Sequence, residues 1–151
     1  MPKLCERFLA ILFYSDLHGV RVVLGLSEIL WAVTLLWPGD TFGRPTYSGM
    51  AQVMSEHAWG FVFLISGLTQ FGIVGKGDYH SRFATYFAGW NLALWLYVVM
   101  SMYMSVFPPP AAISGEAALT IAAGWVWVRS GYIVKGRRSY DYGGKIDRRE
   151  T

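Results

Sequence analysis

Five polar or charged residues interrupt long apolar stretches of the sequence. A charged side chain within the hydrocarbon of a membrane costs at least about 2.5 kcal/mol on insertion scales, so it needs a partner or a wet environment. We therefore take these residues as a candidate intramembrane polar network. They are Arg21, Glu28, Gln70, Asn91 and Arg129.

The spacing of these residues predicts which of them meet. Arg21 and Glu28 are seven residues apart and share one face of a helix. At a rise of 1.5 Å per residue all five lie in the inner half of the membrane, from about 5 Å deep for Arg21 to about 15 Å for Glu28. We expect Glu28 to meet Arg129 across a helix interface, with the long guanidinium arm covering the difference in depth.

Two interpretations of this network remain open. It is either a buried polar clasp that sets the helix register or the lining of an ion or proton path that opens to the cytoplasm. The outer halves of the apolar stretches carry no matching polar residues, which favours the clasp. An oligomeric pore remains an alternative.

Motifs for enzymes, metals and cofactors are missing. The sequence has no Ser–His–Asp arrangement, HExxH or Walker loop, so we expect no enzymatic activity. The single cysteine, Cys5, excludes an intramolecular disulfide and a zinc site built on several thiolates. A haem between two spans would need His18 and His80, and His80 falls in a loop. We therefore expect neither a cofactor nor a metal.

Composition places the chain in the membrane class. Hydrophobic residues make up 54% of the 151 residues and charged residues only 15%, against about 25% charged residues in soluble domains. Four apolar runs approach the roughly 20 residues that a membrane-crossing helix needs. The predicted fold is therefore all-α, a polytopic four-helix transmembrane bundle over residues 18–134, with spans at about 18–37, 58–75, 83–107 and 113–134.

The segments outside the spans have distinct predicted roles. Residues 1–17 are expected to form an interfacial helix, because no small-x-small cleavage site follows their basic and apolar residues. In the first external loop, residues 48–57 are expected to form a short amphipathic helix with Met50, Val53 and Met54 towards the bilayer, as part of a lid on the bundle. Residues 135–151 form a basic tail that we expect to be poorly ordered at its end.

Other local signals concern the last two spans. Pro108 to Pro110 cannot continue a helix and predict a tight hairpin before the fourth span. Ser114 is expected to cap that span, with Glu116 in its first turn. Small residues four apart, such as Ala84 with Ala88 and Thr120 with Gly124, allow close helix contacts without proving an oligomer.

The distribution of basic residues predicts the orientation. Lys and Arg in cytoplasmic loops determine topology, so both termini are predicted to be cytoplasmic. The basic residues flank apolar stretches instead of forming a stripe on a polar domain, which argues against nucleic acid as a partner. One side has only Arg44, whereas the other has Lys3, Arg7, Lys76, Arg82, Lys135, Arg137, Arg138, Lys145, Arg148 and Arg149.

Residues 17–70 also carry a recognisable pattern. A first span ending in LLWPGDTF is followed by RPTY and by a second span that begins with AWG. This pattern resembles small four-span membrane proteins encoded by tailed bacteriophages. The resemblance implies a phage-encoded protein of the bacterial inner membrane and assigns no activity to it.

The expected function is that of a non-enzymatic integral membrane protein whose only certain partner is the lipid bilayer. Three sharper alternatives follow from the composition and the resemblance. The protein is a holin-like pore-forming or lysis protein, an accessory protein that binds a host or phage membrane partner in superinfection exclusion or assembly, or a small ion channel or transporter. A homo-oligomer is compatible with each of them.

Overall fold

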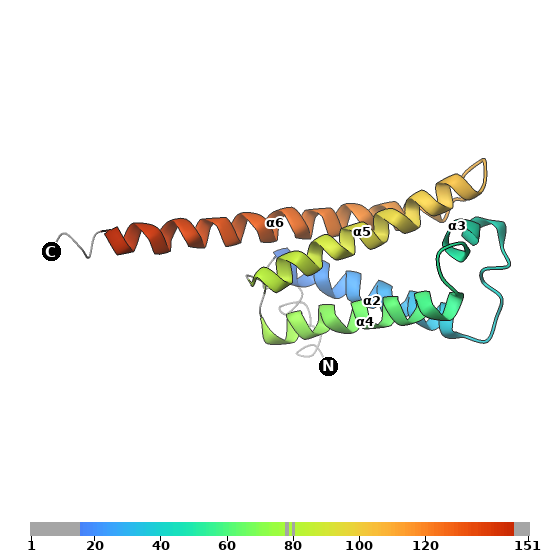
Figure 1. The fold of residues 1–151 in the computed structure, drawn as a ribbon, viewed down its shortest axis with the longest axis horizontal. Coiled ribbons are helices and arrows are strands. Elements are labelled where there is room, and N and C mark those ends of the chain that lie inside the picture. Colours follow the sequence, from blue (N-terminus) through green and yellow to red (C-terminus); the bar gives the residue numbers. More distant parts are fainter. Residues whose placement is uncertain (1–15, 78, 80, 147–151) are drawn as a thin grey trace, which may run out of the picture.

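The computed structural model describes residues 16–77, 79 and 81–146, and the side chains of residues 17–77, 79 and 81–131. These residues form the long helices α2 (Asp16–Leu36), α4 (Glu56–Lys76), α5 (Arg82–Ser105) and α6 (Ile113–Ile146). A 3-10 helix, η1 (Pro45–Tyr47), and a short helix, α3 (Ser48–Ala51), lie between α2 and α4. The described chain contains no strand, and the predicted all-α fold is confirmed (Figure 1).

Three of the helices are long and apolar enough to cross a membrane. They cover Leu17–Leu36, Glu56–Lys76 and Arg82–Ser105, close to the first three predicted spans. The run predicted as the fourth span lies in α6, which continues without a break to Ile146 and so includes most of the predicted tail. The predicted interfacial helix falls almost wholly on residues outside the described part of the chain.

Capping residues determine where α4 and α5 begin and end. The Ser55 side chain accepts a hydrogen bond from the Ala58 amide, and the Ser81 side chain does the same for the Ala84 amide. Gly77 ends α4 with a φ of 62°, a left-handed conformation that glycine adopts without strain. Both helices therefore start before the apolar runs, because polar residues complete their first turns.

The start of α6 differs from the prediction in one detail. The helix begins at Ile113, so Ser114 lies within its first turn instead of capping it. The Ser114 hydroxyl donates to the carbonyl oxygen of Ala111 over 2.8 Å. Glu116 does lie in the first turn, as predicted.

The four long helices form two antiparallel pairs. Figure 1 shows α2 beside α4, and α5 beside α6, and α2 also contacts α6. The α2–α4 pair packs closely at Gly25 and Gly67. A Cβ atom on Gly67 would lie 2.8 Å from the Gly25 carbonyl oxygen, so only glycine permits this approach.

The described bundle buries several polar side chains within an apolar core and exposes large apolar side chains on its surface. Large apolar side chains such as Leu30, Ile65 and Ile121 are exposed on the outside of the bundle. Arg21 and Glu28 are fully buried inside it. This distribution suits a hydrocarbon environment, in which outward-facing apolar groups contact lipid.

The loop between α2 and α4 folds over one end of the bundle. The Trp59 indole N–H donates to the Met50 carbonyl oxygen, and the Tyr97 hydroxyl donates to the Gly49 carbonyl oxygen, each over 3.0 Å. The Glu56 carboxylate accepts from the amides of Thr41 and Phe42. These bonds hold the loop as a lid, as expected.

Two details of the predicted lid helix are wrong. The helix ends at Ala51, because Ser55 already caps α4. Met50, predicted to face the bilayer, is fully buried. Tyr97 on α5 bonds the Gly49 carbonyl and Trp59 on α4 bonds the Met50 carbonyl, so α3 is held against the bundle and Met50 lies in the core. Val53 is exposed, as an outward-facing residue should be.

Candidate functional site

Arg21 joins α2 to the other three long helices. Its Nη1 donates to Gln70 Oε1 on α4 over 3.0 Å, and its Nη2 donates to the carbonyl oxygen of Ala84 on α5 over 3.0 Å. The same Nη2 donates to Ser130 Oγ on α6 over 3.2 Å. The planar fork of a guanidinium suits such a junction, because its donors point in several fixed directions.

His18 and Tyr79 lie at the same end of the bundle. The Tyr79 hydroxyl is hydrogen-bonded to His18 Nδ1 and donates to the Val74 carbonyl oxygen over 3.2 Å. Burial raises the pKa of the Tyr79 phenol, and the positive charge of Arg21 acts in the opposite direction. The neutral phenol is the form that can donate to the carbonyl group.

A second polar layer surrounds Glu28. Glu28 and Asn91 are fully buried and Ser66 is 2% exposed. The Asn91 amide nitrogen donates to Ser66 Oγ over 3.3 Å. The Ser66 hydroxyl and the Trp95 indole lie beside the carboxylate. Neither forms a hydrogen bond with it, and both oxygens of Glu28 and the Trp95 indole nitrogen lack a hydrogen-bond partner among the described residues.

The two layers lie at different depths. Glu28 follows Arg21 by seven residues on α2, which places the two Cα atoms about 10 Å apart along the helix. On α4, Gln70 accepts a hydrogen bond from Arg21. Ser66 lies one turn before Gln70 on the same helix and belongs to the Glu28 layer. The network predicted from sequence therefore separates into an arginine layer and a glutamate layer.

Arg129 does not join the network as predicted. Its side chain is exposed on α6, whereas Glu28 is fully buried. The adjacent Ser130 faces inwards and bonds Arg21. The expected Glu28–Arg129 pair is therefore wrong. Similar predicted depth does not by itself bring two residues into contact, because successive residues of a helix differ by 100° in direction.

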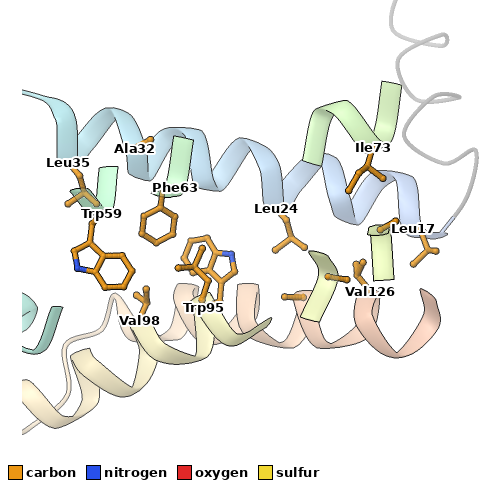
Figure 2. Packing of buried hydrophobic residues seen from close by; sticks show 14 of the residues in the cluster. Leu17, Leu24, Ala32, Leu35, Trp59, Phe63, Ile73, Trp95, Val98 and Val126 are labelled. Carbon is orange, nitrogen blue, oxygen red and sulfur yellow. The ribbon is translucent and has the colours of Figure 1, made fainter. Parts of the chain in front are cut away.

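Aromatic side chains fill the bundle between the Glu28 layer and the lid. The ring centroids of Phe63 lie 5.3 Å from Trp31 and 5.5 Å from Trp95. Trp59 stacks on Tyr97 with centroids 5.4 Å apart. Figure 2 shows Trp59, Phe63 and Trp95 gathered together with Val98 at this end of the core. On the lid side, the two buried polar layers are therefore followed by a layer of large aromatic rings.

Several residues of the site were missed by sequence reasoning. Ser66 and Ser130 are small, common residues in apolar helices and carry little signal by themselves. Ser66 is four residues before Gln70, so the shared face of α4 could have indicated it. Tyr79 and the Ala84 carbonyl group could not have been found, because their role depends on how the helices pack.

This arrangement holds polar groups from four helices in fixed positions. Among the residues that the structure describes, no three His, Cys, Asp or Glu side chains come together in a group that could bind a metal. Comparisons with models of protein families, with curated proteins and with solved structures found no significant match.

Proposed function

We propose that this chain is a phage-encoded, four-span protein of the bacterial inner membrane that acts as a non-enzymatic accessory protein. It binds a membrane-associated partner of the host or the phage on the cytoplasmic side. The observation that carries the proposal is the length of α6, which runs as one helix past the end of the bundle (Figure 1).

The first part of the proposal is that α6 provides a fourth membrane span. α6 lies antiparallel to α5, whose length and composition suit a membrane crossing. Residues 113–134 of α6 would cover about 33 Å as helix, enough to cross the hydrocarbon core. With four spans both termini are on one side, and the excess of Lys and Arg makes that side the cytoplasm.

The second step is the helical arm, by which we mean residues 135–146 of α6. These residues remain helical and would project about 18 Å beyond the membrane-crossing part. The arm contains four basic residues, Lys135, Arg137, Arg138 and Lys145, and one acidic residue, Asp141. A rigid basic helix suits an acidic protein surface at the membrane.

The bundle itself favours this function over a pore. The buried polar residues face the interior of a single chain, and the outer surfaces of α2, α4 and α5 expose apolar residues such as Leu26, Leu68 and Leu96. An oligomeric holin-like pore needs polar faces turned towards a shared lumen. A channel within one chain would have to pass the rings of Trp31, Phe63 and Trp95.

Expression of the full chain in a bacterial host tests the choice between these functions. We expect growth and membrane potential to stay unchanged at high expression. Inducible lysis or loss of membrane potential would contradict the accessory function and support a holin-like or channel function.

Site-directed photo-crosslinking in the same cells tests the partner. A crosslinking amino acid at Ser139 in the arm should give a discrete product, and the same amino acid at Gln52 in the lid serves as the matched control. Replacing Lys135, Arg137 and Arg138 together by Gln should abolish the Ser139 product without affecting membrane insertion. A product that survives this change would contradict a role for the basic arm.

A further inference from the structure

The Glu28 layer has a feature that the accessory function does not use. The carboxylate is fully buried, and neither oxygen has a hydrogen-bond partner among the described residues. Buried carboxylates in proteins are normally hydrogen-bonded, paired with a cation or bound to a metal, because isolated burial is strongly unfavourable. No such partner lies among the described residues, so the charge of Glu28 has to be balanced by a bound cation or by a proton.

Arg21 does not supply that partner. Its guanidinium donates to Gln70, to the Ala84 carbonyl oxygen and to Ser130. These bonds hold it in the other layer, about 10 Å along α2 from Glu28. The positive charge acts on Glu28 only at a distance.

The surroundings of Glu28 supply further oxygen atoms. Ser66 Oγ lies beside the carboxylate and accepts the bond from the Asn91 amide nitrogen. That bond leaves Asn91 Oδ1 without a partner, although Asn91 is fully buried. Three helices thus contribute two carboxylate oxygens, one hydroxyl and one amide oxygen to the same buried layer. Oxygen ligands of these types are those that hard cations prefer.

We propose that Glu28, Ser66 and Asn91 form a binding site for a small monovalent metal cation such as Na⁺. A single carboxylate balances one positive charge, and the described residues bring no group of three His, Cys, Asp or Glu side chains together for a divalent ion. The rings of Trp31, Phe63 and Trp95 lie between this site and the lid. Repulsion by the Arg21 charge weakens binding, and we expect half-saturation in the millimolar range.

Thermal unfolding of the purified full chain in detergent tests the site. Tryptophan fluorescence reports unfolding while Na⁺ replaces choline at constant ionic strength and pH. The wild type should show a saturable rise in Tm with Na⁺. Glu28→Gln, which keeps the shape and removes the charge, should lose this rise. Asp40→Asn, which neutralises an exposed carboxylate in the loop, should keep it.

A second variant covers the case in which Glu28→Gln does not fold. Asn91→Leu removes one ligand oxygen and keeps the carboxylate, so the Na⁺ concentration at half-effect should rise at least tenfold. Equal Tm of the wild type in Na⁺ and choline would overturn the proposal, as would an unchanged Na⁺ response in Glu28→Gln. A response to pH without a response to Na⁺ would also overturn it and would assign the charge balance to a proton.

Discussion

Different interactions hold the two halves of the bundle together: the half around Arg21, called the inner half below, and the half next to the lid, called the outer half. In the inner half one guanidinium, that of Arg21, bonds groups on α4, α5 and α6. In the outer half, stacked rings fill the space between the helices, and two main-chain carbonyls of the lid accept bonds from Trp59 and Tyr97. The inner half thus depends on a few directional bonds and the outer half on the shape of many side chains.

The largest effect should come from the aromatic layer. Phe63→Ala removes a fully buried ring that contacts Trp31 and Trp95. Such truncations typically cost about 3 to 5 kcal/mol of unfolding free energy, from lost contacts and the cavity left behind. Denaturant titration in detergent measures the cost. Phe61→Ala, at an exposed position on the same helix, is the control and should cost far less.

Loss of the Arg21 junction should rank next. Arg21→Met keeps an apolar stem but leaves the Gln70 oxygen, the Ala84 carbonyl and the Ser130 hydroxyl without their donor. Unsatisfied buried groups cost about 1 to 3 kcal/mol each, offset in part by removing a buried charge, so we expect a net loss of about 3 kcal/mol.

Arg129→Met is the matched control for this change, because the Arg129 side chain is exposed. It should alter the unfolding free energy by at most about 1 kcal/mol. If both arginine variants have the same stability, the inner half is not held by Arg21, and the contrast between the two halves fails.

The contact between Gly25 on α2 and Gly67 on α4 lies between the two halves. Its loss should have an intermediate effect on the unfolding free energy. Gly67→Ala places a Cβ atom 2.8 Å from the Gly25 carbonyl oxygen, so the helices must separate at a cost of about 1 to 3 kcal/mol. Gly72→Ala on the same helix meets nothing within 4 Å. It should be neutral or stabilising by about 0.5 to 1 kcal/mol. Thermal unfolding of the two variants side by side measures the difference.

The smallest effect should come from the lid. Tyr97→Phe removes the hydroxyl that donates to the Gly49 carbonyl oxygen and keeps the stacked ring. A single bond of this kind contributes about 1 kcal/mol. Amide hydrogen exchange should show faster exchange in residues 45–54 with little change in the core. Equal exchange throughout the chain would contradict a separately held lid.

Sequence periodicity predicted the helices well because hydrocarbon imposes a simple rule of length and polarity. It located Arg21, Gln70, Glu28 and Asn91 in the interior for the same reason. It failed for Arg129, whose direction depends on how α6 is rotated against α2. The tight glycine contact between Gly25 and Gly67 on α2 and α4 was not among the small-residue pairs that the sequence predicted in α5 and α6. Which residues of different helices contact each other depends on tertiary packing, which composition and periodicity do not determine.

The continuity of α6 has a mechanical consequence. Because the backbone helix does not break between Ile113 and Ile146, the rotational position of the arm about its axis follows from the packing of α6 against α5. Inserting one residue after Val134 would rotate the arm about its axis by about 100° without changing its composition. Inserting seven would restore its direction and move it about 10 Å outwards. Binding of a partner to the arm would therefore depend separately on the rotation of the arm about its axis and on its distance from the membrane.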